Sequence, residues 1–219
     1  MDLSARLLHH FGSSNGILEG QEMLNALKKT RTLVLITIAS GIALVSSGLA
    51  DTRGDASLKE AKGIIKAFAS SLKAELQAAL NAGGPTNAIQ VCKERAPAIA
   101  VDYSAQTGWD VGRTSLRLRN PSANAPDDWE KQVLLKFEER KAGGEDVKIM
   151  AFAEVTQVNG EKRFRYMQAI PTSELCLVCH GEVLAPDIGT ALDEAYPEDQ
   201  ARGFSLGDIR GAFTLSKPL

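Results

Sequence analysis

Three residues late in the chain stand at a spacing that supports chemistry: Cys176 and Cys179 are separated by two residues, and His180 follows directly. Two cysteines at this spacing on one turn reach the two vinyl groups of a porphyrin and form thioethers, which makes CxxCH the attachment pattern of c-type haem. A histidine directly after the second cysteine lies under the iron, where neutral imidazole is a common ligand. The motif therefore predicts one covalent haem c, with His180 as an iron ligand.

Three other chemistries use the same residue types. A CxxC pair serves as the redox couple of thioredoxin-like proteins, but there it opens a helix in a βαβ unit, and here it follows a predicted antiparallel hairpin. Zinc could formally be held by Cys92 together with the motif, although adjacent Cys179 and His180 rarely turn to one tetrahedral ion. A plain disulfide is the third alternative, in an oxidising compartment.

The first fifty residues have the pattern of an export signal. A basic cluster at residues 28–31 precedes an uncharged apolar run at residues 32–44, and Gly48 and Ala50 stand at the −3 and −1 positions of a signal-peptidase site. The run is shorter than the roughly twenty apolar residues that span a bilayer. We therefore expect a leader over residues 1–50, cleavage, a periplasmic location and no stable membrane insertion afterwards. An uncleaved membrane anchor is the alternative.

The leader prediction leaves one domain, residues 51–219. Residues 1–22 precede a second methionine and the basic cluster, and we interpret them as a start-site extension. Two of the three histidines, at positions 9 and 10, lie in this leader, so His180 is the sole histidine of the mature chain. Chemistry that needs two imidazoles is thereby excluded, including a haem peroxidase with a distal histidine.

Composition and charge narrow the function further. The chain has 25 basic and 27 acidic side chains, a net charge of -2, and no basic run. This balance offers no face for nucleic acid and no polybasic segment for anionic lipid. We expect a binding protein rather than an enzyme.

Hydrophobic periodicity predicts helices in the first half of the mature chain. A helix is expected over residues 57–81, with Ser57 as its N-cap and Gly83-Gly84 ending it. A second helix follows to about residue 106, and Pro97 is expected to kink or break it. A third helix is capped by Asp127 and reaches Lys141.

Alternating patterns predict strands in the second half. A strand is expected over residues 109–118, and two runs at residues 149–157 and 162–170 flank Asn159-Gly160, a pair preferred in two-residue hairpin turns. A last strand is expected at residues 211–216. Helices followed by such strands predict an α+β domain with an antiparallel sheet.

Cys92 is left over once the motif is assigned. It lies on the apolar stripe of the second predicted helix, with Ile89 and Ile99. An odd cysteine in an exported protein is either an inert buried thiol or a ligand, and both alternatives stand. No histidine or methionine follows the motif, and the mature methionines are Met150 and Met167.

Several separated segments resemble the bacterial family of c-type haem proteins with a PAS-like domain. They are VCKERAP at 91–97, TGW at 107–109, VGRTS at 111–115, RNP at 119–121, NAPD at 124–127, CLVCHG at 176–181 and GDIRGAF at 207–213. The resemblance implies a PAS-like antiparallel sheet flanked by helices, and His180 and a helical cysteine on the two faces of the haem iron. Cys92 occupies that cysteine's position in the matching motif.

The expected function is a periplasmic haem-binding protein, a redox- or gas-responsive sensor type with iron held by His180 and Cys92. The family's haem domain also occurs fused to sensory kinases and chemoreceptors, so a diatomic gas and a separate redox or signalling protein are expected partners. An electron carrier with Met150 or Met167 as ligand is the alternative. Arginines suit the haem propionates because a guanidinium binds a carboxylate with two parallel hydrogen bonds. Arg113 is the first choice, ahead of Arg117, Arg119 and Arg210.

Overall fold

The computed structural model describes the backbone of residues 18–219 and the side chains of residues 54–219. Contacts divide the chain into two units, Met1–Arg53 and Gly54–Leu219, and the second holds every candidate residue. The predicted extension and leader fall in the first unit, where residues 1–17 and all side chains lie outside the described part, so they stay predictions. Within the described residues, no helix combines the length and apolar character needed to cross a membrane.

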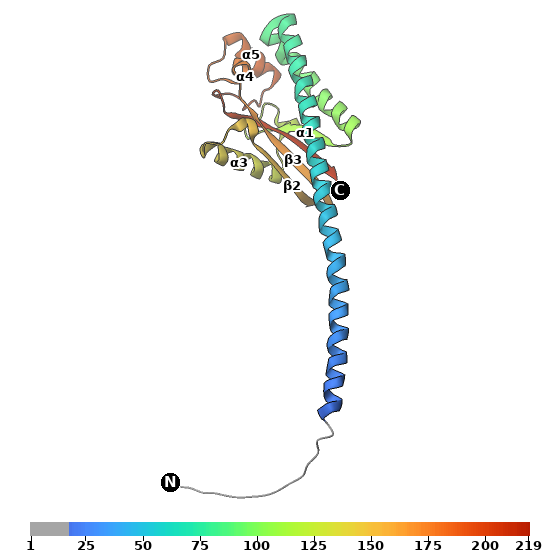
Figure 1. Cartoon of the computed structure of the whole chain (residues 1–219). Helices are drawn as coiled ribbons and strands as arrows, with labels where there is room; N and C mark the ends of the chain where they lie inside the picture. Colours follow the sequence, from blue (N-terminus) through green and yellow to red (C-terminus); the bar gives the residue numbers. More distant parts are fainter. Residues whose placement is uncertain (1–17) are drawn as a thin grey trace, which may run out of the picture. The chain divides into compact units, whose positions relative to one another are not determined.

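Short groups of helices and strands follow one another along the chain (Figure 1). The helices are α1 (Leu18–Thr107), α2 (Pro121–Asn124), α3 (Asp128–Ala142), the 3-10 helix η1 (Val147–Ile149), α4 (Glu174–His180) and α5 (Pro186–Ala195). The strands are β1 (Asp110–Thr114), β2 (Ala151–Val158), β3 (Glu161–Pro171) and β4 (Ile209–Pro218). The α+β class predicted from the sequence is confirmed.

The described strands form an antiparallel sheet in the order β1-β4-β3-β2. The β2–β3 hairpin turns at Asn159 and Gly160, whose φ angles of 52° and 85° are the positive pair that a type I′ turn requires. This hairpin confirms the sequence prediction. The last strand of the chain, β4, lies between β1 and β3 and completes the sheet.

Each face of the sheet is covered by a different helix. Alternate residues of a strand point to opposite faces, and in β3 Phe164 and Tyr166 pack with α1 whereas Met167 and Ala169 pack with α3. The α1 face has Phe68, fully buried, at its centre. The remaining core on that face comes from Ala61, Ile64, Ile65, Ile99, Trp109, Val111 and Leu215. The α3 face is completed by Val133, Leu134, Phe137, Val147, Met150, Ile209 and Ala212.

The structure corrects two expectations for α1. Ser57 is not an N-cap, because the backbone is helical on both sides of it and its side chain is buried. Pro97 does not break the helix, and only Gly83 and Gly84 depart from helical angles. The break at these glycines was predicted, and Gly84 has a φ of 72°, which only glycine adopts without strain. A proline inside a helix removes one backbone hydrogen bond and clashes with the preceding turn. The burial of Ile99 in the core, two residues later, compensates for this loss.

Other local predictions are confirmed or shortened. Asp127 caps α3 in a reciprocal capping box. The Asp127 carboxylate accepts from the backbone amide of Glu130, and the Glu130 carboxylate accepts from the backbone amide of Asp127. The first strand ends at Thr114 rather than at residue 118. Gly211 of β4 approaches so closely that a Cβ there would lie 2.4 Å from the Thr114 carbonyl oxygen. The helix α5 was not predicted.

Candidate functional site

The helix α4 carries both cysteines of the motif and His180 on two turns (Figure 1). Ser173 precedes it, with its backbone nitrogen and Oγ lying 3.4 and 3.2 Å from Cys176 Sγ. Cys92, Cys176 and Cys179 are all free thiols, so the structure does not contain the alternative disulfide. The motif cysteines are only half-buried, which leaves both thiols accessible for a covalent reaction.

Gly181 ends this helix in a way that no other residue allows without movement. Its φ of −68° is ordinary, but a Cβ there would lie 2.7 Å from the carbonyl oxygen of Leu177. The glycine therefore lets the chain leave α4 directly after the histidine and continue to the loop that contacts it.

His180 is held as a neutral imidazole of one tautomer. Its Nδ1 lies 2.7 Å from the carbonyl oxygen of Ala201, which can only accept, and 2.9 Å from Arg119 Nη2, which can only donate. The shorter contact, to the carbonyl, requires the proton on Nδ1. Nε2 is then the acceptor, in agreement with the Arg210 Nε donor 3.3 Å from it. Burial, together with the positive charges of Arg210 and Arg119, lowers the pKa of His180 to about 2. The ring of Phe204 stands edge-on to the imidazole at 6.1 Å. A neutral imidazole with an acceptor Nε2 is the form that binds a metal ion.

A buried ion pair supports the loop behind His180. The Asp199 carboxylate, 1% exposed, accepts from Arg119 Nε at 3.1 Å, from Arg202 Nε at 2.8 Å and from the Ala201 amide at 2.9 Å. Arg119 Nη2 in turn donates to the carbonyl oxygens of Cys179 at 2.5 Å and Ala201 at 3.0 Å. The carbonyl that fixes the His180 tautomer is thereby fixed itself.

Two guanidinium groups at the site have no carboxylate partner. Among the described residues, no carboxylate lies within 4 Å of Arg113 or Arg210, although Arg113 is half-buried. Arg210 Nε lies 3.3 Å from His180 Nε2, and burial with repulsion from Arg119 and Arg113 lowers the pKa of Arg210 to about 9. Uncompensated cations beside an acceptor imidazole fit a ligand that carries carboxylates of its own. Arg117 differs, because it is engaged by the carbonyl oxygens of Arg202 and Gly203.

The structure brings Cys92 to the motif from the second part of α1. One helical turn before it, Ile89 packs in a cluster with residues of α5, and Cys179 packs against this cluster. Burial raises the pKa of the Cys92 thiol, Arg113 opposes this shift, and the charge of Cys92 acts in turn on Cys179 and Tyr196. Cys92 is therefore close enough to Arg113 and to Cys179 for their charges to influence one another. Whether Cys92 is an iron ligand stays a prediction.

The methionines lie elsewhere. Met150 and Met167 are fully buried in the core between α3 and the sheet, apart from the groups that contact His180. In the described part of the chain, no three histidine, cysteine, aspartate or glutamate side chains converge as metal ligands. The antiparallel sheet disfavours a thioredoxin-like redox couple.

Sequence patterns missed Asp199, Ala201 and α5. Asp199 contacts Arg119 from 80 positions away, and Ala201 contacts His180 from 21 positions away. Hydrophobic periodicity does not predict contacts between residues so far apart in the chain. The sequence did single out Arg119, but for a different partner.

One solved structure and one protein-family model are similar to this chain. No curated protein matches the chain. A solved structure, that of the cyanobacterial heme-protein Tll0287, is similar in fold, with 24% sequence identity and a TM-score of 0.53 over 73% of this chain and 95% of that one. The sequence model of the Tll0287-like family matches residues 21–218, so the chain belongs to the Tll0287-like family.

Proposed function

We propose that this protein binds one haem c, tethered by Cys176 and Cys179, with His180 as an axial ligand of the iron. One observation carries the proposal: a neutral imidazole with Nε2 as acceptor lies on the same short helix as two free thiols, and all three residues are half-buried. The fold similarity to a protein described as a heme-protein supports it. A haem supplies a one-electron redox couple and an axial position that small molecules can occupy.

Residues around the motif have matching roles in this proposal. Cys92 is the second axial ligand, and Arg113 and Arg210 bind the propionates, because both guanidinium groups lack a carboxylate partner among the described residues. Asp199 and Arg119 orient His180 through the Ala201 carbonyl. We also propose that the sheet and its flanking helices are a PAS-like domain over residues 51–219.

Within this frame we infer a sensor role, responsive to redox state or to a diatomic gas, in the periplasm after removal of a leader at residues 1–50. Cys92 is the displaceable group. Its sulfur binds metal as a thiolate and holds a proton when released, which burial favours by raising the pKa of the thiol. Cys92 belongs to α1, the helix that covers one face of the sheet, so release of its sulfur from the iron would shift this helix. A separate signalling protein would bind in response.

Intact-mass spectrometry of protein made in a host that matures c-type cytochromes tests attachment. We expect the polypeptide mass plus one haem, and the polypeptide mass alone for Cys176→Ala/Cys179→Ala. Bare polypeptide in the unmodified protein would refute the proposal. Cys92→Ser serves as the matched control: it keeps the haem mass but changes the ferric EPR spectrum, and an unchanged spectrum would remove Cys92 from the ligand set.

An electron carrier is the second candidate, and one observation favours it. Leu175 and Val178 on α4 are 39% and 38% exposed, and Val183 just beyond is 90% exposed. Exposed apolar side chains beside a redox centre suit brief docking of an electron-transfer protein. If Val183→Asp slows electron exchange with a small c-type cytochrome severalfold and Cys92→Ser leaves the rate unchanged, the carrier role holds and the sensor role fails.

A further inference from the structure

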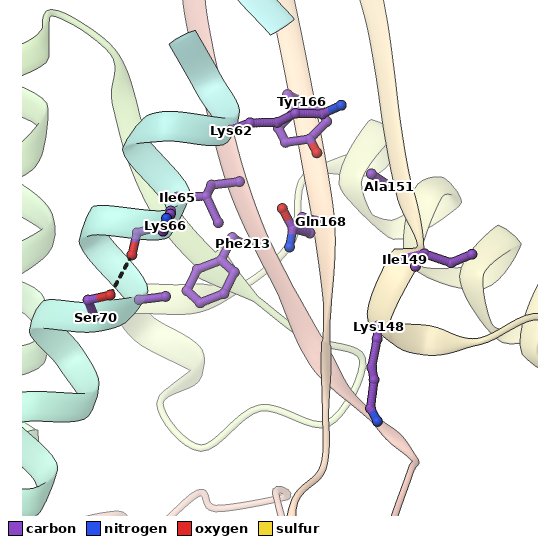
Figure 2. A pocket seen from close by; sticks show the side chains of 11 residues that line it. Lys62, Ile65, Lys66, Ser70, Lys148, Ile149, Ala151, Tyr166, Gln168 and Phe213 are labelled. Atoms are coloured by element: carbon purple, nitrogen blue, oxygen red, sulfur yellow. Dashed lines mark hydrogen bonds between the residues drawn. The ribbon is translucent and has the colours of Figure 1, made fainter. Parts of the chain in front are cut away.

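A cavity opens on the α1 face of the sheet, apart from His180. It has a volume of about 580 Å³ and lies between the first part of α1, the 3-10 helix η1 and strands β2 to β4 (Figure 2). None of the residues that contact His180 lines it, and all of its lining residues belong to the unit Gly54–Leu219. Its volume is within the range of small-molecule sites in proteins.

The interior of this cavity is apolar. Ile65 of α1 and Phe213 of β4 point toward its middle in Figure 2, and Ala69 and Ala151 line it as well. Ile149 stands at its rim with 73% of its surface exposed. Ile65 is only 2% exposed, whereas Ala69, Ala151 and Phe213 are partly exposed, so the uncovered apolar surface of the cavity comes mainly from these three and from Ile149. Such surface favours a ligand with a hydrocarbon body.

The rim carries positive charge without compensation. Lys62 and Lys66 come from α1 on one side and Lys148 from η1 on the other (Figure 2), and the lining includes no acidic residue. Among the described residues these three lysines have no carboxylate within 4 Å, whereas Lys141 and Lys217 pair with Asp208 and Glu60. Lys62 and Lys66 are one turn apart on one helix face, where like charges repel each other. An anion at this rim would relieve the repulsion.

Two neutral hydrogen-bond donors complete the lining. The Tyr166 hydroxyl and the Gln168 amide have no hydrogen-bond partner among the described residues, and both side chains come from β3 on the wall of the cavity (Figure 2). Burial raises the pKa of Tyr166, so its hydroxyl remains a donor at neutral pH. Donors beside an ammonium group favour a carboxylate, which only accepts.

We propose that this cavity binds an amphipathic organic carboxylate, with its head at Lys62 and Lys66 and its hydrocarbon body against Ile65 and Phe213. This site is separate from the motif, and its ligand is neither a haem nor a diatomic gas. The proposal therefore stands or falls independently of haem attachment. The domain would then bind an organic acid as a second ligand. That ligand would contact α1, the helix that also contains Cys92.

Ligand-observed NMR titrations of the protein as purified from an exporting host, whether or not it holds haem, test the proposal, with octanoate as the probe. Octanamide has the same hydrocarbon body without the charge, and inorganic phosphate has charge without the body. We expect saturable binding of octanoate, and binding at least fivefold weaker for the other two. Equal binding of octanamide, or of phosphate, would overturn the proposal, since it would show that only one of the two features is used.

Matched variants locate the site. Lys62→Gln/Lys66→Gln removes two charges from the rim and is expected to weaken octanoate binding about three- to tenfold, as for two exposed ion pairs. Lys59→Gln/Lys73→Gln removes two exposed charges from the same helix outside the cavity and is expected to change binding less than twofold. Ala69→Leu fills the interior and is expected to abolish binding. Unchanged binding in both cavity variants, with their folding verified by circular dichroism, would refute the site.

Discussion

His180 Nδ1 and the carbonyl oxygen of Ala201 lie 2.7 Å apart, and this hydrogen bond leaves Nε2 as the accepting nitrogen of the only described histidine. The carbonyl is fixed in turn by Arg119 and Asp199. A carbonyl or carboxylate behind a ligating imidazole raises its basicity and sets its orientation. The loop of residues 199–203 is therefore part of the site, although none of its side chains has to contact a ligand.

Asp199→Asn is expected to destabilise the protein by about 3 kcal/mol, because it leaves the buried Arg119 guanidinium without its counter-charge. Urea unfolding measures the change. Asp193→Asn is the control: Asp193 also pairs with Arg202, but its side chain is 70% exposed, and a loss of less than about 1 kcal/mol is expected. Similar losses in the two variants would show that Asp199 acts only as a surface partner of Arg202.

The haem-free protein, Cys176→Ser/Cys179→Ser, is expected to lose stability as pH falls. The folded pKa of His180 is about 2 and its ordinary value is 6.5, so between these values the unfolded chain binds the proton and the folded chain does not. Stability is thus full above pH 6.5 and falls by about 2 kcal/mol between pH 7.5 and pH 5. Adding His180→Gln should remove this component. Parallel unfolding curves with and without His180 would mean that the imidazole is protonated in the folded state.

Gly181→Ala is expected to destabilise the fold by about 2 kcal/mol, because the new Cβ would meet the Leu177 carbonyl oxygen at 2.7 Å. Gly189→Ala in α5 is the opposite case. Nothing lies within 4 Å of a Cβ there, so the substitution should stabilise the helix by about 0.5–1 kcal/mol. Thermal unfolding of the two variants compares them directly, and equal effects would contradict the close approach at Gly181.

Arg113→Gln is expected to lower the reduction potential of the haem-loaded protein by on the order of tens of millivolts, since removing a nearby positive charge favours the oxidised iron. Arg163→Gln removes an arginine that pairs with Asp110 at the far end of β1 and should leave the potential almost unchanged. Redox titration followed by absorption measures both. A potential unaffected by Arg113→Gln would place this residue away from the haem.

Local features of the fold were accessible from the sequence because their causes are local. Asn159-Gly160 specifies its turn through positive φ, and Asp127 with Glu130 specifies the start of α3 through two reciprocal hydrogen bonds. Ser57 misled the same reasoning: its pattern matches a capping box, but the chain before it is also helical, so no helix end exists for it to cap. A cap motif predicts a helix start only where the preceding residues cannot continue the helix.

The candidate residues of the site could be picked out from the sequence, but the residues that hold them in place could not. The CxxCH motif and the odd Cys92 point to a cofactor from their residue types alone. Asp199 has an ordinary sequence context, and only the folded chain brings its carboxylate to Arg119 from 80 positions away. The same holds for the three lysines of the cavity on the α1 face, since Lys148 joins Lys62 and Lys66 only through tertiary structure.

The place of β4 in the sheet has a consequence for maturation. Because β1 pairs with no other described strand and β3 needs β4 on its second edge, the sheet stays incomplete until residues 209–218 have been synthesised. Cys176 and Cys179 precede that segment, so a chain that emerges from its N-terminus exposes both thiols before the sheet can close. Removing residues 209–218 would accordingly leave β1 and β3 without the strand that joins them, while the motif stays in the chain.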